Sequence, residues 1–452
     1  MTQPVTLPLW LLLVILAFAA VTALSHFLLP SVRWFFRKRA ERVVAELNKR
    51  LARPIEPFKL ARRHDMIQRL LYDPEVTHAV VEESRTEGIP ENVAFQQARA
   101  YAREIVPSFS ATAYFSVGMR LARWLTNSTY EVRIGSFDRD ALVTIDPYAT
   151  VIFVMNHRSN MDYVLVTWLV SRASAMSYAV GEWARIWPLS SLIKMMGAYF
   201  IRRRSRGHLY RRVLARYVQL ATENGVTQAF FPEGGLSLDG YTAAPKHGLL
   251  DYVTRRGEEG RDVIFVPVGL NYDRVLEDRV LIAAQGQTDR RFVVSKTKIA
   301  RALLGHLRQR LTGRFAGFGI ASVSFGKPLH LADYTGDTED LARELMARIT
   351  AIIPILPVPI TARAVLEVGG PATRARVQAL AETAQERDRR LPVSDPADLY
   401  QRGIAALRQR DLIVENADGP YPKDEGARRI LAFYAASAGW PSQDSLVSAV
   451  AK

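Results

Sequence analysis

The 452-residue sequence contains no cysteine. This absence excludes disulfide bonds, thiolate metal sites, a cysteine nucleophile and a thiol-linked acyl intermediate. The sequence also has no internal repeat, no low-complexity tract and no helix-turn-helix, RNA-binding or zinc signature, and its basic residues are spread along the chain. We therefore expect no cysteine-based metal site and no nucleic-acid partner.

Acidic residues are the minority among the charged ones. The formal net charge is +15, and 48% of the residues are hydrophobic, which is enough for a packed globular core. A positive field attracts anionic lipid headgroups or phosphate-bearing substrates and carriers, although a solvated surface accounts for many of these charges equally well.

Only one long hydrophobic run is present, at residues 7–29. A helix of that length can cross a hydrocarbon core of about 30 Å. The aromatic and cationic collar at residues 33–42 favours a cytoplasmic position for the body of the protein. The run predicts a single N-terminal membrane span with a cytoplasmic body; a buried or interfacial helix is the alternative, because Pro8, Ser25 and His26 weaken the span.

Composition and hydrophobic pattern divide the sequence into four parts. We expect a membrane anchor with its basic collar at 1–39, a helical module at 40–135, an α/β domain at 136–355 and a C-terminal helical region at 356–452. Within the α/β domain, short β-branched and aromatic runs alternate with helical stretches, which predicts a mixed or largely parallel sheet flanked by helices. The predicted strands are 149–155, 176–180, 198–201, 227–231, 263–270 and 321–325, and the predicted helices are 163–171, 209–224 and 339–353, with an extended linker at 354–359.

The first predicted strand leads directly into His157, which Asp162 follows after four intervening residues. If the turn after His157 opens a helix, the two side chains fold back toward each other. A neutral imidazole accepts a proton from a hydroxyl, while a carboxylate on its other nitrogen fixes the tautomer. Such a pair needs no serine nucleophile if the activated hydroxyl belongs to the substrate. A capping aspartate beside a surface histidine is the ordinary alternative.

Three further segments combine strand ends with polar groups. Arg202 and Arg203 follow a strand and suit a phosphorylated substrate, or equally an anionic lipid surface. Glu233, Gly234 and Gly235 end another strand, where glycines permit close approach to the backbone. The fourth is the apolar run 263–270, which contains Pro267 and fits either an acyl-chain wall or ordinary core packing.

The order and spacing of these segments resemble the four motifs of the glycerolipid acyltransferase superfamily, and most of all its bacterial membrane-bound glycerol-3-phosphate and dihydroxyacetone-phosphate acyltransferases. The first block of that branch, H-R-S-x-M-D-Y, is matched by residues 157–163, and the second, G-A-F-F-I-R-R, is resembled by residues 197–203. The resemblance spans residues 100–300 approximately.

The resemblance implies roles for individual residues. His157 would be the general base and Asp162 its partner. The implied substrate-binding residues are Arg158, Ser159, Arg202, Arg203, Glu233, Gly234, Gly235, Lys246 and Pro267. Arg202 would contact the acceptor phosphate with Arg203 supporting it, and Glu233 and Gly234 would contact the glycerol part.

The implied reaction is direct attack of the sn-1 hydroxyl of glycerol-3-phosphate on acyl-CoA or acyl-carrier protein, with no metal or bound cofactor, and with the bilayer as a partner. The third block departs from the family pattern R-S-R-T-G, because Leu236 and Leu238 replace the two cations. This departure leaves dihydroxyacetone phosphate or lysophosphatidate open as the acceptor, and also a noncatalytic lipid-binding relative.

Overall fold

The computed structural model describes residues 8–11, 13–16, 38–39, 41–181, 189–202, 207–255, 261–285, 317–386 and 391–438. The chain divides into two compact units, Met1–Ile55 and Glu56–Lys452, and the second contains the sheet. Most of the predicted span at 7–29 lies outside the described residues. Among the described residues, no single helix is long and apolar enough to cross a membrane, although the bent pair Thr338–Ile352 and Pro357–Glu367 passes the same test jointly.

An eight-stranded mixed sheet forms the centre of the second unit, in the order β1-β7-β6-β2-β5-β3-β4, with β8 paired to β6. The strands are β1 (Glu131–Phe137), β2 (Thr150–Met155), β3 (Ser177–Val180), β4 (Tyr199–Phe200), β5 (Gln228–Phe230), β6 (Val263–Tyr272), β7 (Ile320–Phe325) and β8 (Leu329–His330). Pairing is parallel from β6 through β2, β5 and β3 to β4 and between β1 and β7, whereas β6 is antiparallel to both β7 and β8. The predicted mixed α/β sheet is therefore confirmed.

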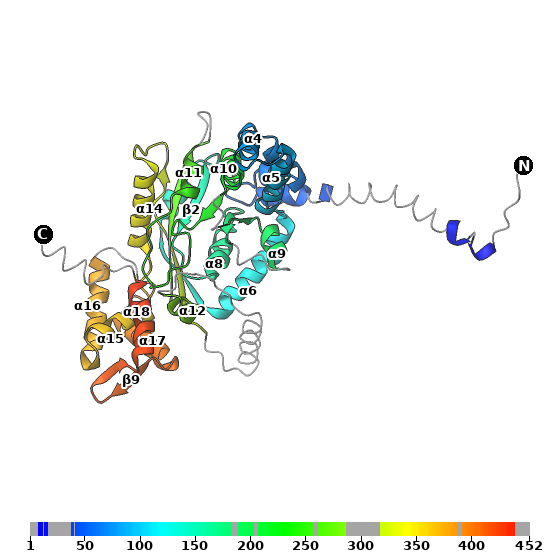
Figure 1. Cartoon of the computed structure of the whole chain (residues 1–452). Coiled ribbons are helices and arrows are strands. Elements are labelled where there is room, and N and C mark those ends of the chain that lie inside the picture. The colour runs from blue at the N-terminus through cyan, green and yellow to red at the C-terminus, as the bar shows by residue number, and fades with distance from the viewer. Residues whose placement is uncertain are drawn as a thin grey trace, which may run out of the picture. The chain divides into compact units, whose positions relative to one another are not determined.

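Helices cover both faces of this sheet (Figure 1). The N-terminal helices are α2 (Pro57–Leu60), α3 (Arg63–Leu71), α4 (Pro74–Glu87), α5 (Glu91–Ile105), the π-helix η1 (Ala113–Gly118) and α6 (Met119–Thr129). Between the strands lie α7 (Arg139–Val143), α8 (Met161–Val170), α9 (Leu189–Met195), α10 (His208–Glu223), α11 (Gly248–Thr254) and α12 (Asp278–Ala283). After β8 come α14 (Thr338–Ile352), α15 (Pro357–Glu367), the 3-10 helix η3 (Gly370–Ala372), α16 (Thr373–Glu386), α17 (Pro396–Gln409), the hairpin β9 (Ile413–Asn416) and β10 (Gly419–Pro422), and α18 (Glu425–Ala436).

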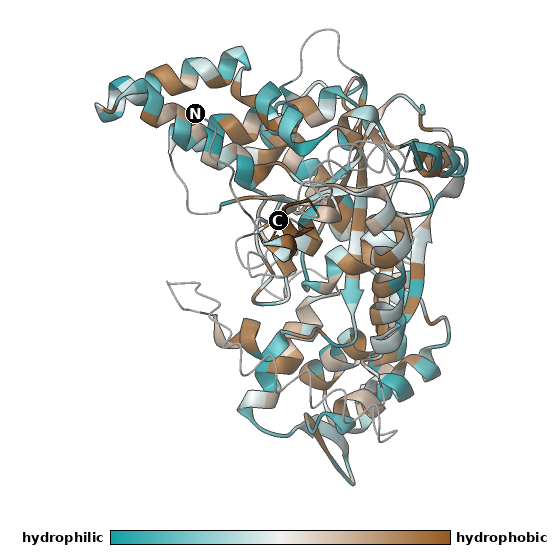
Figure 2. Ribbon diagram, turned by 90° about the vertical axis from the view of Figure 1, so that its right-hand side faces the viewer, coloured by the Kyte–Doolittle hydropathy of each residue, from teal (hydrophilic) through white to brown (hydrophobic). Residues whose placement is uncertain are grey.

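The two faces belong to separate hydrophobic clusters, because successive side chains of a strand point to opposite sides. In β2, Val151, Phe153 and Met155 join the cluster built with α8, α15, α17 and α18. Ile152 and Val154 join the cluster built with α3, α4, α5, α10, α11 and α14. Every residue of β2 is buried, as expected for a central parallel strand, and the helices show the alternating hydrophobic and hydrophilic bands of amphipathic packing (Figure 2).

Local sequence accounts for several boundaries. Asp73 and Asp337 accept a hydrogen bond from a backbone N–H in the first turns of α4 and α14, the usual cap for such donors. The extended linker predicted at 354–359 is wrong in its second half, since Pro357 and Pro359 begin α15, where the first turn tolerates proline. The sheet also begins at Glu131, inside the part that was expected to be helical.

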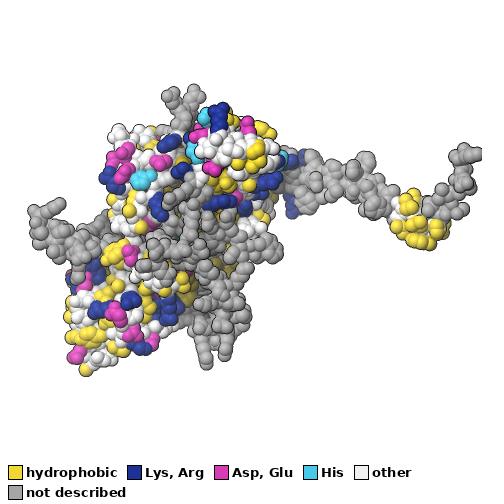
Figure 3. All heavy atoms as spheres, viewed as in Figure 1, with side chains coloured by type: hydrophobic (Ala, Val, Ile, Leu, Met, Phe, Trp, Pro, Cys, Tyr) yellow, Lys and Arg dark blue, Asp and Glu magenta, His cyan; other side chains and the backbone are white. Residues whose placement is uncertain are grey.

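Basic residues are distributed over many elements. On the face seen in Figure 3, Lys and Arg lie among Asp and Glu over the described surface. Many of the arginines form ion pairs, including those of Arg216 with Asp73 and Arg261 with Glu56. Much of the positive charge is thus balanced locally.

Candidate active site

His157 and Asp162 meet at the carboxyl end of β2. The strand ends at Met155 and α8 begins at Met161, so the intervening turn brings the aspartate back to the histidine. The imidazole Nδ1 lies 2.9 Å from Asp162 Oδ2, and the two side chains are 1% and 0% exposed. Imidazole Nε2 makes no hydrogen bond to the described residues, so it is the nitrogen left for a substrate hydroxyl.

The carboxylate of Asp162 is held by three further donors. Oδ2 also accepts the backbone N–H groups of Arg158 at 2.7 Å and Ser159 at 3.0 Å. Oδ1 accepts the hydroxyl of Tyr272 at 2.7 Å. Burial raises the pKa of Tyr272 well above its usual value, and the nearby carboxylate raises it further, so this hydroxyl stays a donor at neutral pH. These contacts fix the orientation of the carboxylate and hence of the imidazole.

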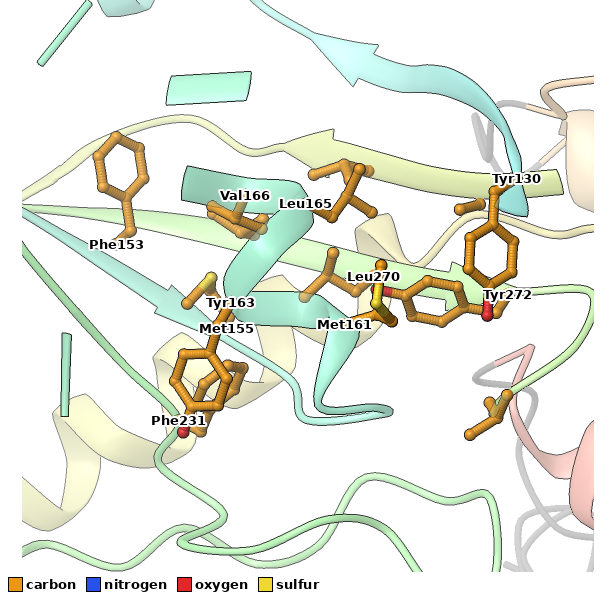
Figure 4. Close-up of a cluster of buried hydrophobic side chains, with 14 of the residues drawn as sticks. Tyr130, Phe153, Met155, Met161, Tyr163, Leu165, Val166, Phe231, Leu270 and Tyr272 are labelled. Atoms are coloured by element: carbon orange, nitrogen blue, oxygen red, sulfur yellow. The ribbon is translucent and has the colours of Figure 1, made fainter. Parts of the chain in front are cut away.

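Aromatic rings fix the plane of the imidazole. Phe231, the residue directly after β5, stacks on His157 with ring centroids 3.8 Å apart and an angle of 19° between the planes. Tyr163 meets His157 edge-on, with ring centroids 5.5 Å apart. Figure 4 shows Tyr163 and Phe231 together on one side of this cluster and Tyr272 beside Tyr130 on the other.

Glu233 supports the backbone of the histidine. Its Oε1 accepts the N–H of His157 and its Oε2 accepts the N–H of Ala243, each at 2.8 Å. Burial raises the pKa of Glu233, although both N–H groups and Arg158 favour the ionised form. The carboxylate predicted to contact glycerol therefore braces the turn that carries the base, and its glycerol contact stays a prediction.

The side chain of Arg158 is bound to backbone carbonyls near the active site. The side chain is 1% exposed, and its guanidinium donates to the carbonyl of Gly240 and, at 3.0 Å, to that of Ser437. These bonds tie the turn after β2 to the loop after β5 and to the end of α18. Arg158 thus helps to hold the site together, and the substrate contact that its motif implies stays a prediction.

A second carboxylate, that of Glu277, accepts hydrogen bonds from Ser159 and Asn160 in the first motif. It accepts the hydroxyl of Ser159 at 2.8 Å and the side-chain amide of Asn160 at 3.0 Å. Burial raises the pKa of Glu277, which the Ser159 and Asn160 donors partly offset. The sequence analysis assigned no role to Glu277 or Tyr272. Both lie at or just after the carboxyl end of β6, which is parallel to β2, and this position could have predicted that their side chains reach the sheet edge that carries His157.

The side chain of Lys246 lies beside the third motif, at Gly234. Gly234 has φ +68°, and a Cβ added there would lie 2.8 Å from Lys246 Cδ and 3.1 Å from its Nζ. The backbone of Lys246 donates to the carbonyl of Pro232 at 2.8 Å, which keeps the lysine beside the loop. The half-buried Gly235 follows in the same loop. Lys246 Nζ consequently lies next to the segment that also braces the base.

Arg202 is placed on a more distant strand. It follows β4, three strand positions from β2, or about 14 Å at the usual strand spacing. Its guanidinium binds both oxygens of Glu104 and lies 5.2 Å from the ring centre of Tyr101 and 5.5 Å from that of Tyr210. The predicted phosphate contact of Arg202 stays a prediction, and Arg203 lies outside the described residues.

Pro267 lies inside the sheet. Its missing N–H costs no ladder bond, because β8 pairs with β6 through Ile264 and Phe265 whereas β7 pairs from Val268 onward. Leu236 and Leu238, which replace the expected cations, pack against the hydrophobic cluster of the α8 face. No group of three or more His, Asp or Glu within the described ranges is placed to hold a metal ion.

Comparison with known proteins finds related sequences. Residues 142–271 match the family model described as Acyltransferase. A glycerol-3-phosphate acyltransferase of Pseudomonas syringae pv. tomato is 29% identical over 299 residues, covering 64% of this chain and 34% of the relative. That of Ectopseudomonas mendocina is 30% identical over 284 residues, covering 61% of this chain and 32% of the relative.

The chain spans about a third of the length of the curated relatives it matches. Among solved structures, the 1-acyl-sn-glycerophosphate acyltransferase of Thermotoga maritima matches with a TM-score of 0.31 and 17% identity, covering 64% of this chain and 94% of that one.

Proposed function

We propose that this chain, whose residues 142–271 match the Acyltransferase family model, is a member of the glycerolipid acyltransferase superfamily and transfers a fatty acyl group from a thioester to the sn-1 hydroxyl of glycerol-3-phosphate. The observation that carries the proposal is the buried His157–Asp162 pair, whose carboxylate has four hydrogen-bond donors and whose imidazole keeps Nε2 for the substrate. The named relatives supply the acceptor, since they are glycerol-3-phosphate acyltransferases.

The reaction needs one base and no enzyme nucleophile. His157 Nε2 takes the proton of the acceptor hydroxyl as its oxygen attacks the thioester carbon. The imidazolium that forms is stabilised by Asp162 at Nδ1, as in other histidine–carboxylate pairs. The tetrahedral oxyanion then collapses, the carbon–sulfur bond breaks, and the proton passes from His157 to the leaving thiolate. The products are an ester and a free thiol.

Two cations are candidates for the acceptor phosphate. Lys246 lies beside Gly234, in contact with the loop that includes Glu233. Arg202 lies about three strand spacings from β2, the strand that leads to His157, although its pairing with Glu104 orients the guanidinium. Because glycerol-3-phosphate is short, the position of Lys246 favours it as the phosphate ligand while the sn-1 hydroxyl is at His157.

The remaining expectations belong to the same proposal. The donor is acyl-CoA or acyl-carrier protein, the product is a lipid, and a span at residues 7–29 would hold the domain at the cytoplasmic face of a bacterial inner membrane. The apolar run and the basic collar after it support that placement.

A matrix of substrates tests the proposal. Purified full chain in detergent is given palmitoyl-CoA or palmitoyl carrier protein with radiolabelled glycerol-3-phosphate, dihydroxyacetone phosphate or lysophosphatidate. We expect transfer to glycerol-3-phosphate. Preference for lysophosphatidate would instead tie the apolar Leu236 and Leu238 to an acceptor that already carries a chain, and the absence of transfer with every pair would refute acyltransferase activity.

Two matched substitutions then locate the phosphate. Lys246→Gln is expected to raise the KM for glycerol-3-phosphate roughly tenfold or more, the loss of one charge-assisted contact, with a smaller effect from Arg202→Gln. A large effect of Arg202→Gln together with a small effect of Lys246→Gln would assign the phosphate to the strand-end arginine instead.

A further inference from the structure

A cavity of about 980 Å³ lies beside the active site, at the junction of α6 with β1, the start of β7 and α17. It is open to solvent and large enough for a small organic ligand. Tyr130 lines it and packs against Tyr272, with ring centroids 5.3 Å apart (Figure 4). Since Tyr272 bonds Asp162, two aromatic rings separate the cavity from the catalytic pair.

Three arginines line this cavity, and one of them carries a buried donor without an acceptor. The side chain of Arg410 is 8% exposed, and its Nη2 is paired with Asp278. Its Nη1 is buried and has no hydrogen-bond partner among the described residues. A buried charged donor left unsatisfied is costly, so this group calls for an acceptor from outside the chain.

Arg274 is the second donor. Its guanidinium lies 4.6 Å from the ring centre of Phe318, which also lines the cavity. Within the described ranges no carboxylate forms an ion pair with Arg274. Burial and the positive charge of Arg410 lower the pKa of Arg274, whereas the carboxylate of Asp278 raises it.

The other charged groups of the cavity are already satisfied. Arg402 is paired with Asp398 and with Glu131. Asp273 accepts the backbone N–H of Ile320 through one oxygen and that of Val358 through the other. Within the described ranges the cavity therefore offers one guanidinium without an ion pair, that of Arg274, and one unsatisfied donor, Nη1 of Arg410, and a phosphate group has the oxygens to accept from both.

We propose that this cavity is a second anion site, in which Arg274 and Nη1 of Arg410 bind the phosphate of a phosphate-bearing ligand. Two sources have this chemistry: the nucleotide phosphates of an acyl-CoA donor, and the glycerophosphate part of an acceptor or product. The choice between these sources rests on the proposed acyl transfer, whereas the anion site itself does not.

Binding without turnover tests the site. Isothermal titration of the full chain in detergent uses 3′-phosphoadenosine 5′-diphosphate in one arm and glycerol-3-phosphate in the other. Arg274→Gln removes the donor that has no ion pair and leaves the Arg410–Asp278 contact intact. Arg279→Gln is the matched control, because Arg279 is an exposed arginine in the neighbouring helix and does not line the cavity.

We expect Arg274→Gln to weaken one probe ten- to hundredfold, the loss of a charge-assisted hydrogen bond, while Arg279→Gln leaves its affinity within twofold. Weakening of the nucleotide assigns the site to the donor, and weakening of glycerol-3-phosphate assigns it to the acceptor. If neither probe responds to Arg274→Gln, or if both variants weaken binding equally in a chain with unchanged melting temperature, the anion site is refuted. Failure of acyl transfer alone would leave the titration result standing.

Discussion

Asp162→Asn probes the carboxylate at the centre of the site without changing its size. In the native protein Oδ2 accepts three donors and Oδ1 accepts only the Tyr272 hydroxyl. An asparagine can keep its oxygen at the three-donor position and turn its NH₂ toward Tyr272, whose hydroxyl then accepts. The geometry is thus retained and the negative charge is lost.

The expected cost falls on the chemical step. Loss of the carboxylate removes the stabilisation of the imidazolium, and general-base catalysis of this kind contributes about 10²- to 10⁴-fold. We therefore expect kcat to fall by that factor, equivalent to about 3–5 kcal/mol, with little change in KM. Tyr272→Phe removes a single donor to the same carboxylate and should cost roughly tenfold in kcat.

The assay is steady-state acyl transfer together with thermal unfolding of each variant. Tyr217→Phe serves as the control, because Tyr217 is a buried tyrosine in the cluster on the opposite face of the sheet. If Asp162→Asn keeps more than a third of wild-type kcat with an unchanged melting temperature, the carboxylate does not assist the base and the reasoning fails.

Two further predictions concern stability. Gly240→Ala should destabilise the chain by about 2–4 kcal/mol, since Gly240 has φ +91° and its added Cβ would lie 2.0 Å from the carbonyl oxygen of Phe433. Gly88→Ala is the control and should cost only about 1–2 kcal/mol, because Gly88 has φ +64° but open space around it. Equal melting temperatures for the two variants would contradict this prediction. Burial raises the pKa of Asp273 to about 6, so between pH 4 and 6 the folded state binds more protons than the unfolded one and this group stabilises less as pH rises. The stability advantage of wild type over Asp273→Asn should therefore shrink by about 2 kcal/mol from pH 4 to pH 7 in thermal unfolding, and a constant difference would show that the carboxyl does not titrate there.

Local patterns in the sequence predicted much of the sheet. The six predicted strands are present with bounds shifted by at most two residues, because their β-branched runs are buried on both faces. β1 was missed: its residues 131–137, all exposed or half-buried, become a strand only by pairing with β7, some 190 residues later. The hairpin of β9 and β10 was missed in a region that is otherwise helical.

In the active site, too, contacts between residues close in sequence could be predicted, whereas contacts between distant segments could not. His157 and Asp162 are five positions apart, so spacing alone brought them together. Tyr272 lies 110 positions from Asp162, and its contact arises from the parallel pairing of β2 and β6. The contacts of Arg158 were not predictable either, since its side chain donates to backbone carbonyls of two segments distant in sequence.

The most direct measurement of the central claim is the turnover of His157→Ala with the acceptor that the wild-type chain uses. We predict a loss of at least 10²-fold in kcat with KM within about threefold, because the ring contributes the base and little of the binding. The melting temperature should fall, since the variant loses the buried ring that stacks on Phe231 and pairs with Asp162, so kcat is measured below the unfolding transition. A variant that transfers acyl groups at close to the wild-type rate would contradict the assignment of His157 as the base.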